Sequence, residues 1–507
     1  MSLIGMDVGS TGCKAVAFNA DGQVLAQAYR EYPEIYPAPG WIELCPHDMW
    51  DAICAVLRQV SEAVKNDPPQ ALCISALGEA FTPIDREGRS LYNTIVSPDA
   101  RAVRQAESWR DRLGERRVFE ITGMPLSPSF TLNKIMWMRD ERPDIHAKTW
   151  KYLLWPDLIF FKLGLEPRLD WSLAGRTMAF DVVNKCWSQE MLDAAGLSAD
   201  LFAEPIRPGE VVGELPASGA EATGLPRGCL IVAGGHDQPM NALGAGIIRE
   251  GMAVDGMGTV ECITVAFEKP VLTDAMLRNN YCCYPHVYDE MYASLAFTYS
   301  SGSILRWYRD NFGRWWRQEA QRTGADVYDL ILSELPDGPT GLMLVPYFAG
   351  SGTPYLDALA RGGILGLSLD VEEKTFIKAL IEGICYEMRL NVERLAQAGV
   401  RIDRLRCTGG GAKSPVWLQL KADIIGIPAV TINVTESGCQ AGAILGGVAA
   451  GVYESVDAAV EQLVQERQVF EPNPQMHERY QPFYELYTQV WPTIRDISHR
   501  ISDLLSR

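Results

Sequence analysis

The chain opens with short apolar runs separated by polar turns, a pattern typical of β-strands joined by hairpins. An apolar strand at residues 3–6 ends in Asp7, and a Gly/Ser/Thr turn leads into a second strand that begins near Lys14. Asp21-Gly22 supplies a further hairpin turn before a third strand. We therefore expect three consecutive strands at the start of the chain.

Longer patterns follow these strands. Residues 49–65 place apolar side chains at helical spacing, which predicts a helix. Further segments are predicted as strands (71–76, 81–85, 229–233 and 404–408), a mostly helical stretch (101–203), a loop-rich stretch (205–228), a helix (376–396) and a helix-rich tail (456–505). Strands with interposed helices place the chain in the α/β class.

A second copy of the opening pattern follows a small-residue segment at residues 244–251. There DGMGT (residues 255–259) stands between two apolar runs, as DVGST (residues 7–11) does at the start. Two such matches, each opening half of the chain, suggest a duplicated fold. We predict an N-terminal domain at residues 1–246 and a C-terminal domain at residues 247–507.

The composition fits a folded protein and narrows its partners. Of 507 residues, 47% are hydrophobic and 22% are charged, and the length suits two domains. The net charge of −18 argues against a nucleic-acid surface, because phosphate backbones require a cationic footprint. A local glycine-rich pocket can still bind a nucleotide on an acidic protein.

The cellular compartment of the protein can be predicted from three further features of the sequence. No basic leader precedes the first strand, and no apolar run reaches the length of a membrane span. The 12 cysteines are scattered, without CxxC spacing, which favours reduced thiols. We expect a cytoplasmic protein without membrane association.

The first candidate site is the turn after Asp7. Gly9, Ser10 and Thr11 offer backbone N–H groups and hydroxyls to a phosphate, and Lys14 can place a cation nearby. Asp7 could hold a magnesium ion, since hard cations on phosphates prefer carboxylate and water oxygens. A plain glycine-rich hairpin turn remains the alternative, because the segment matches neither common phosphate-loop pattern.

The second candidate is Gly-Gly-His-Asp-Gln at residues 234–238, which follows a predicted buried strand. Hydroxyl attack on a γ-phosphate needs a proton acceptor, and Asp237 suits that task. Taken alone, Asp237 is equally well read as the cap of the next helix. The neighbouring His236 is interpreted as structural, because a lone His beside an Asp makes neither a metal site nor a triad.

The third candidate is the glycine run of TGGGAKS at residues 408–414, between a strand and an apolar helix. Such a turn suits an approaching nucleotide, because a helix N-terminus favours phosphate. A tight turn without a ligand is the alternative. A later small-residue segment, ESGCQAGA at residues 436–443, would allow close helix packing beside the nucleotide.

Taken in order, these segments resemble the FGGY family of carbohydrate kinases, members of the actin-like ATPase superfamily. The resemblance runs nearly end to end and is carried by GMDVGSTGCKAVAF, GWIELCPHDMW, IDREG, PDARA, GGHDQ, DGMGT, PYFAGSGTPYLDALARGGILGL, EGICYEMR, CTGGGAKSPVWLQLKADIIGIP and ESGCQAGAILGGVAAGVY. It implies two actin-like (ribonuclease H-like) domains flanking a central cleft for nucleotide and sugar. It also implies ATP and Mg²⁺ as cofactors and allows a homodimer.

The resemblance implies a role for each matching residue. Asp237 would be the catalytic base, and Asp7 would assist magnesium. The ATP phosphates would lie along Gly9, Ser10, Thr11 and Lys14 and meet Gly258 and Thr259, while Gly410, Gly411 and Ser414 would border the adenosine. The sugar would lie near Gly78, Glu79, Asp237 and Gln238.

The acceptor segment departs from xylulokinase-like members, which carry Gln-Met-His-Gly where this chain has Ala-Leu-Gly-Glu-Ala at residues 76–80. Glu79 is closer to the glycerol kinase pattern, in which an arginine precedes the glutamate, but this chain has Gly78 in place of that arginine. It also has Ser97 where family members usually carry an aromatic residue. Glu79 can accept hydrogen bonds from two vicinal hydroxyls, so a polyhydroxylated acceptor is retained. The small Gly78 and Ser97 predict room for an acceptor larger than glycerol.

The favoured function is phosphorylation of a small sugar or polyol, with a ketopentose such as xylulose first among the acceptors. Glycerol, a tetritol or a sugar acid are alternatives within the family. An actin-like ATPase module without a sugar substrate, and a catalytically silent sugar sensor, are alternatives of other classes. The response of ATP turnover to an added sugar separates them.

Overall fold

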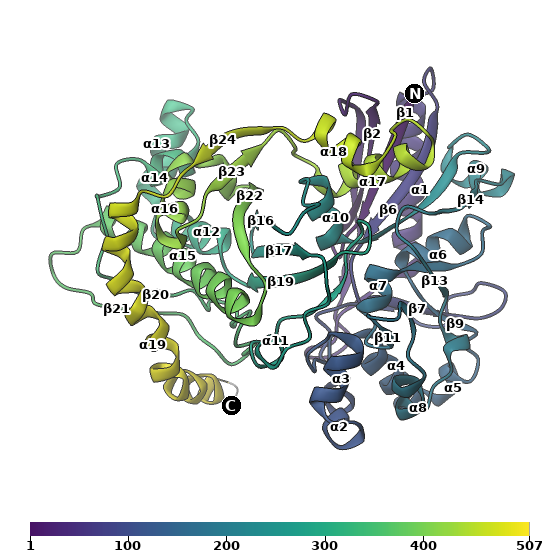
Figure 1. The fold of residues 1–507 in the computed structure, drawn as a ribbon, viewed down its shortest axis with the longest axis horizontal. Helices are drawn as coiled ribbons and strands as arrows, with labels where there is room; N and C mark the ends of the chain where they lie inside the picture. The colour runs from purple at the N-terminus through teal and green to yellow at the C-terminus, as the bar shows by residue number, and fades with distance from the viewer. Residues whose placement is uncertain (506–507) are drawn as a thin grey trace.

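The computed structural model describes residues 1–505 and forms two lobes (Figure 1), each built around one mixed sheet. Within that range the first sheet has six strands, in the spatial order β14 (Val211–Glu214), β15 (Leu230–His236), β6 (Pro69–Ala76), β1 (Ser2–Val8), β2 (Gly12–Asn19) and β3 (Val24–Glu31). The second has seven, in the order β18 (Tyr284–Pro285), β19 (Tyr292–Thr298), β17 (Glu261–Phe267), β16 (Gly251–Met257), β22 (Ile402–Thr408), β23 (Ala429–Ile432) and β24 (Glu466–Phe470).

The two sheets repeat one topology. In the first, β1 is antiparallel to β2 and parallel to β6, and β15 extends the parallel side. In the second, β16 is antiparallel to β17 and parallel to β22, and β23 extends the parallel side. The third strands, β3 and β19, are each antiparallel to the second. The duplication predicted from the two Asp–Gly turns is therefore confirmed, and the predicted strands at both turns are present.

The first half of the chain adds helices and small sheets beside the first sheet. Its helices are α1 (Pro46–Ala63), α2 (Val103–Arg112), α3 (Glu115–Thr122), α4 (Thr131–Glu141), α5 (Pro143–His146), α6 (Trp155–Lys162), α7 (Trp171–Gly175), α8 (Gln189–Ala195), a 3₁₀ turn (Ala199–Leu201), α9 (Ala217–Thr223) and α10 (Asp237–Gly244). A smaller sheet has the order β4 (Glu34–Ile35), β5 (Glu43–Leu44), β8 (Thr94–Ile95), β7 (Phe81–Ile84) and β9 (Lys151–Leu154), and two strand pairs join β10 (Arg168–Asp170) to β13 (Glu204–Ile206) and β11 (Phe180–Asp181) to β12 (Cys186–Trp187).

The second half is richer in long helices. They are α11 (Asp274–Arg278), α12 (Gly302–Asn311), α13 (Arg314–Thr323), α14 (Val327–Leu332), α15 (Glu373–Ala398), a 3₁₀ turn (Gly411–Lys413), α16 (Pro415–Ile425), α17 (Ser437–Ala449), α18 (Val456–Leu463) and α19 (Pro474–Leu505), with one further strand pair, β20 (Met343–Val345) and β21 (Gly363–Leu365). The predicted helix at 376–396 and the strand at 404–408 are confirmed.

Helix α17 comes late in the chain but packs on the first sheet. It contacts β1, β6 and α10, and in Figure 1 it lies with the N-terminal strands. The close approach requires glycine: a Cβ at Gly5 would overlap the Cys439 carbonyl oxygen, and one at Gly244 would overlap that of Ser437. Small residues therefore allow β1, α10 and α17 to pack closely at the centre of the molecule.

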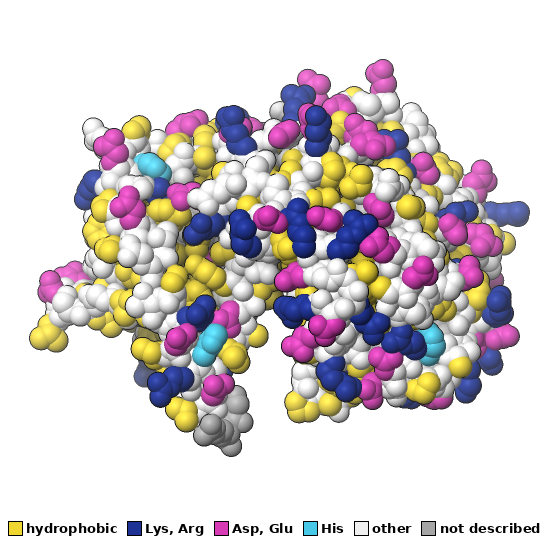
Figure 2. Space-filling view, turned by 60° about the horizontal axis from the view of Figure 1, so that its bottom comes forward, with side chains coloured by type: hydrophobic (Ala, Val, Ile, Leu, Met, Phe, Trp, Pro, Cys, Tyr) yellow, Lys and Arg dark blue, Asp and Glu magenta, His cyan; other side chains and the backbone are white. Residues whose placement is uncertain are grey.

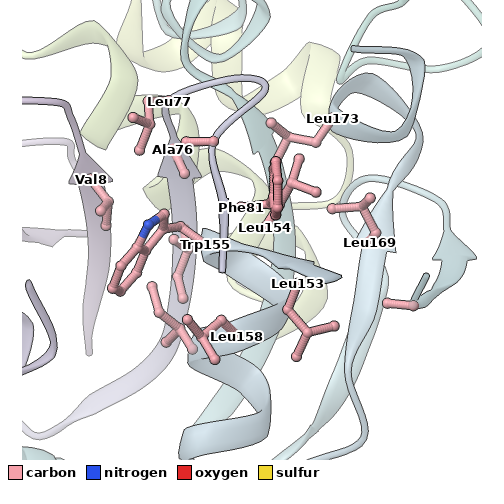
Figure 3. Close-up of a cluster of buried hydrophobic side chains, with 14 of the residues drawn as sticks. Val8, Ala76, Leu77, Phe81, Leu153, Leu154, Trp155, Leu158, Leu169 and Leu173 are labelled. Carbon is pink, nitrogen blue, oxygen red and sulfur yellow. The ribbon is translucent and has the colours of Figure 1, made fainter. Parts of the chain in front are cut away.

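A hydrophobic cluster supports the ends of β1 and β6 (Figure 3). Val8, Ala76 and Leu77 meet Trp155 on α6, and Leu173 on α7 lies on the other side of the group. Val8 and Trp155 are fully buried. Because this packing fixes the strand ends and α7 together, it holds the loop after β6 in place.

One prediction for an irregular segment needs correction. The stretch at 205–228 was expected to be loop-rich, yet it contains β14 and α9, and these short elements tolerate Gly213 and Gly219 within them. The helix-rich tail is confirmed by α18 and α19, and it also includes the edge strand β24 between them. The boundary near residue 246 stays a prediction.

No helix among residues 1–505 is long and apolar enough to cross a membrane. On the face shown in Figure 2, basic and acidic side chains alternate, without a continuous basic patch on that side.

Candidate active site

The two repeated turns differ in the state of their carboxylates. Asp7 is the second-last residue of β1 and half-exposed, and its Oδ1 accepts a hydrogen bond of 2.9 Å from Ser75. Burial raises the pKa of Asp7, while the Ser75 hydrogen bond and the charge of Lys14 act against that rise. The carboxylate faces a pocket of about 220 Å³, so it can meet a ligand.

Asp255, the counterpart of Asp7 in the second sheet, is fully buried. Lys421 on α16 forms an ion pair with Asp255 and a second one of 2.6 Å with Glu261. Glu261 also accepts a hydrogen bond of 2.6 Å from Ser301. Asp255 is thus paired within the protein, and of these two carboxylates Asp7 is the one that is free to bind a ligand.

The small pocket lies where the two sheets meet. It is lined by Asp7, Gln238, Asn241, Val254, Gly256, Cys262, Thr408, Gly409, Thr435, Glu436, Ser437, Gly438 and Cys439. Residues from both halves of the chain therefore enclose one space beside Asp7.

A second pocket of about 620 Å³ unites glycine turns that are far apart in sequence. Its lining includes five residues predicted to bind the nucleotide: Gly258, Thr259, Gly410, Gly411 and Ser414. Ser414 is also the N-cap of α16, where its hydroxyl accepts a hydrogen bond from the Trp417 N–H. The size and glycine-rich wall suit a nucleoside. A larger hollow of about 1340 Å³ lies beside the β7–β9 edge, and its lining includes none of the predicted site residues.

The first turn is ordered by its own backbone. The Gly9 N–H donates a hydrogen bond of 2.9 Å to the Gly12 carbonyl. Within this turn the Thr11 side chain is exposed and the Ser10 side chain is half-exposed. Lys14 does not point into solvent, because its Nζ donates to both carboxylate oxygens of Glu436 at 2.8 and 2.9 Å. Glu436 lines the small pocket, so Lys14 lies at its edge.

Asp237 is the first residue of α10, directly after β15. The N-cap position belongs to His236, without a side-chain cap bond, so Asp237 does not serve as the cap. Its Oδ1 is buried and forms no well-aligned hydrogen bond with the described residues. Burial, joined by the charges of Asp7 and Glu79, raises the pKa of Asp237 to about 8.

His236 is held rigidly beside this carboxylate. Its backbone N–H donates to Ser172 Oγ at 2.9 Å, and its Nδ1 lies 3.0 Å from the Tyr284 hydroxyl. Its Nε2 lies 3.1 Å from Asp237 Oδ1. The histidine is packed, as predicted, yet it also touches the candidate base.

Gly78 and Glu79 occupy the loop after β6. A Cβ at Gly78 would come within 2.8 Å of the His236 ring, so the imidazole fills the room that the missing side chain leaves. The expectation that Gly78 enlarges the acceptor site is therefore wrong. Glu79 is nearly buried, and Arg176 Nε donates to its Oε1 at 2.5 Å.

The prediction from sequence missed α7, which supports both sides of this site. Asp170 caps the helix and accepts hydrogen bonds from the Ser172 and Leu173 N–H groups, and Ser172 in turn receives the His236 N–H. Arg176, just after α7, holds Glu79. With five residues α7 is too short to show a helical period, and only the Arg176 charge in an otherwise apolar stretch could have drawn notice.

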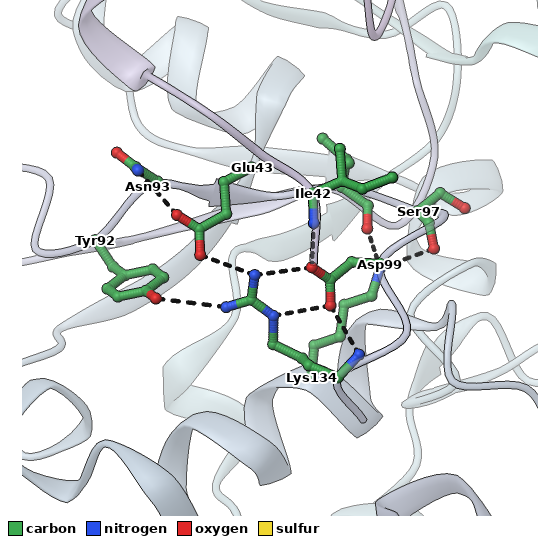
Figure 4. A network of polar contacts seen from close by, with 9 residues as sticks. Ile42, Glu43, Tyr92, Asn93, Ser97, Asp99 and Lys134 are labelled. Carbon is green, nitrogen blue, oxygen red and sulfur yellow. Dashed lines mark hydrogen bonds and ion pairs between the residues drawn. The ribbon is translucent and has the colours of Figure 1, made fainter. Parts of the chain in front are cut away.

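The loop that carries Ser97 is held in place by hydrogen bonds from buried side chains (Figure 4). Lys134 Nζ donates to the carbonyls of Val96 and Ser97, at 2.6 and 3.3 Å. Arg101 binds Asp99 and Glu43, and Asp99 accepts a hydrogen bond from the Ile42 N–H. The loop is thus rigid, and whether Ser97 makes room for a larger acceptor stays a prediction.

Two domains of ribonuclease H-like topology, a nucleotide-sized pocket in the second of them and a carboxylate beside the small pocket that both halves line define the class of two-domain sugar kinases. The chain matches the N-terminal domain of the FGGY family of carbohydrate kinases over residues 2–244 and its C-terminal domain over residues 256–450. The chain belongs to the FGGY family of carbohydrate kinases and is an ATP-dependent phosphotransferase.

Relatives with different substrates match over nearly the full length. Xylulose kinase of Bacillus subtilis is 26% identical, with 98% of each chain covered. Autoinducer-2 kinase of Klebsiella pneumoniae is 29% identical, covering 96% of this chain and 93% of its own, and gluconokinase of Bacillus subtilis is 28% identical over 91% and 90%. Ligand-bound xylulose kinase from Lactobacillus acidophilus shares the fold, with a TM-score of 0.89, 23% identity and coverage of 97% and 98%.

Proposed function

We propose that this chain transfers the γ-phosphoryl group of ATP to a hydroxyl of a small sugar or polyol, with a ketopentose such as xylulose as the favoured acceptor. The observation that carries the proposal is the Asp237 carboxylate, whose buried Oδ1 forms no well-aligned hydrogen bond with the described residues and lies 3.1 Å from His236 Nε2. It adjoins the pocket that Asp7 and Gln238 line. The full-length match to xylulose kinases supports the choice of acceptor.

In this mechanism Asp237 is the general base. It accepts the proton of the attacking hydroxyl, the hydroxyl oxygen forms the bond to the γ-phosphorus, and the bond to the ADP oxygen breaks. A raised pKa makes the carboxylate a better proton acceptor near neutral pH. His236 and Tyr284 would hold the carboxylate in place.

The nucleotide would occupy the 620 Å³ pocket, with Gly410, Gly411 and Ser414 at the adenosine. Gly258 and Thr259 would meet the phosphates from the second sheet. Gly9, Ser10, Thr11 and Lys14 would meet them from the first, where backbone N–H groups in a tight turn favour anions.

Mg²⁺ would bind with the phosphates beside Asp7. The site fits such an ion, because Asp7 is a half-exposed carboxylate at the pocket wall and retains one oxygen free of Ser75. Mg²⁺ commonly uses one or two carboxylates together with substrate phosphates and water. When bound, it would neutralise charge on the transferring phosphoryl group.

Glu79 and Gln238 would bind the acceptor hydroxyls. Glycerol, a tetritol and a sugar acid remain alternative acceptors, and the names of the relatives add autoinducer-2 to the candidates. We further propose a cytoplasmic protein, in line with its free cysteines, and a homodimer by family resemblance.

The test is ADP release with ATP and Mg²⁺ across D-xylulose, D- and L-ribulose, L-fuculose, gluconate, glycerol, erythritol and autoinducer-2, with a control lacking acceptor. Turnover that depends on one ketose or polyol supports the proposal. ATP hydrolysis that no acceptor stimulates would contradict it and favour an ATPase without a sugar substrate.

A further inference from the structure

Arg176 is fixed in the acceptor region by contacts on every side. Its guanidinium lies 5.2 Å from the ring centres of both Phe130 and Tyr284. Its Nη1 lies 3.6 Å from Met124 Sδ, and its Nε and Nη2 both engage Glu79 Oε1. A guanidinium held between two rings cannot turn away, so the ion pair has one geometry.

Glu79 is equally constrained, but one oxygen is left over. Its backbone lies in the left-handed region at φ 59°, and its carbonyl accepts a hydrogen bond of 3.0 Å from Thr131. Both contacts with Arg176 engage Oε1, and Oε2 accepts no hydrogen bond from the described residues. The site thus offers a single acceptor oxygen whose charge is already balanced.

We propose that the Arg176–Glu79 pair determines acceptor specificity: because Glu79 already occupies the Arg176 guanidinium, the acceptor site selects uncharged polyols and rejects sugar acids. The proposal rests on the proposed kinase function and names the substrate class for it. Hydroxyl donors of a ketose or polyol can satisfy Glu79 Oε2, whereas a carboxylate has no hydrogen to donate to it.

An anionic acceptor would also find no spare cation. Arg176 is committed to Glu79, and Lys134, the other buried cation whose charge interacts with Glu79, spends its Nζ on the carbonyls of Val96 and Ser97. Asp237 lies within electrostatic range of Glu79 and adds negative charge there once it is ionised. Because an unpaired buried charge is costly, a sugar carboxylate would be repelled rather than bound.

The same geometry predicts how specificity can be reversed. In Glu79→Gln the guanidinium stays between its two rings but loses its counter-ion, which leaves a preformed receptor for a carboxylate. We expect the ratio of kcat/KM for gluconate to that for D-xylulose to rise about tenfold or more, as a charge-assisted hydrogen bond would give. The gain should vanish in Glu79→Gln/Arg176→Gln, which lacks the guanidinium.

A remote Arg–Glu pair supplies the matched control. Glu393 on α15 accepts a hydrogen bond of 2.9 Å from Arg389, so Glu393→Gln makes the same chemical change outside the site, and the ratio should stay at the wild-type value. Thermal melting establishes that each variant is folded, and Arg176→Gln alone serves as a second variant, expected to gain no gluconate binding.

Gluconate binding by calorimetry, without ATP, decides the proposal independently of turnover. Binding to Glu79→Gln at least about tenfold tighter than to wild type supports it. Equal binding, or a wild-type enzyme that prefers gluconate to D-xylulose, overturns it while leaving the kinase function intact. If wild type phosphorylates no acceptor, the proposed function fails, and the calorimetric comparison still decides the role of Arg176.

Discussion

Lys14 on β2 and Glu436, 422 positions further along the chain, form a two-oxygen ion pair at the edge of the small pocket, with Nζ–O distances of 2.8 and 2.9 Å. Lys14 is a predicted phosphate ligand, so Glu436 competes with the nucleotide phosphates for the Lys14 ammonium group. Glu436 also turns a negative charge towards the space assigned to the phosphates. The pair joins the first sheet to the segment that leads into α17.

Lys14→Met should weaken ADP binding about tenfold, the loss of a charge-assisted contact worth about 1.5 kcal/mol. Glu436→Gln should strengthen it about threefold, because a half-exposed pair contributes less than 1 kcal/mol. Calorimetric titration with ADP measures both. Lys148→Met, at an exposed lysine after α5, is the control. Unchanged affinity in Lys14→Met would remove Lys14 from the phosphate site.

Asp237→Asn should lower kcat by about 10² to 10⁴, the usual contribution of a positioned general base, while ADP affinity stays unchanged. The amide has nearly the same shape, and it avoids the cost of burying a charge, so the melting temperature should not fall. Asp48→Asn, in the first turn of α1 and exposed, should leave turnover intact. Wild-type kcat in Asp237→Asn would exclude the assigned role.

The pH dependence of kcat/KM should report the same carboxylate. Burial first, then the charges of Asp7 and Glu79, raise the pKa of Asp237 to about 8. A base must be ionised to act, so kcat/KM should rise with pH up to about that value and then level off. Glu79→Gln removes one repelling charge and should move the midpoint to lower pH, as should Mg²⁺ beside Asp7. A profile that is flat across neutral and alkaline pH would contradict this account.

Features that depend on local pattern could be predicted from the sequence. Strand ends followed by Asp and Gly located Asp7 and Asp237, and the repeat of that pattern revealed the duplication of the sheets. Arg176 and Tyr284 escaped notice, because their contact with Glu79 and His236 arises only when α7 and β18 pack together. The pairing of Lys14 with Glu436 depends likewise on tertiary structure.

Asp7 and the buried Asp255–Lys421 pair should differ in what their substitution impairs, which is activity at Asp7 and stability at the pair. Asp7→Asn should abolish most activity without loss of stability, because burial already disfavours its charged form. Lys421→Met should cost about 3–5 kcal/mol of unfolding free energy, because Asp255 and Glu261 would remain as unpaired buried carboxylates. Urea denaturation measures both, and Asp255→Asn should restore part of the loss in Lys421→Met. Equal stability of Lys421→Met and wild type would show that the pair is not needed.

The glycine contacts at the centre of the molecule predict a stability effect that depends on position. In Gly244→Ala the new methyl group would overlap the Ser437 carbonyl, so α10 and α17 must separate, at a cost of about 1–3 kcal/mol. Gly363→Ala, where nothing lies within 4 Å of the new Cβ, is the matched control and should change stability little. Because α10 begins at Asp237, the displaced helix should also lower kcat in Gly244→Ala. Thermal melting and ADP release measure the two effects, and identical behaviour of both variants would show that the approach of α10 and α17 does not depend on glycine.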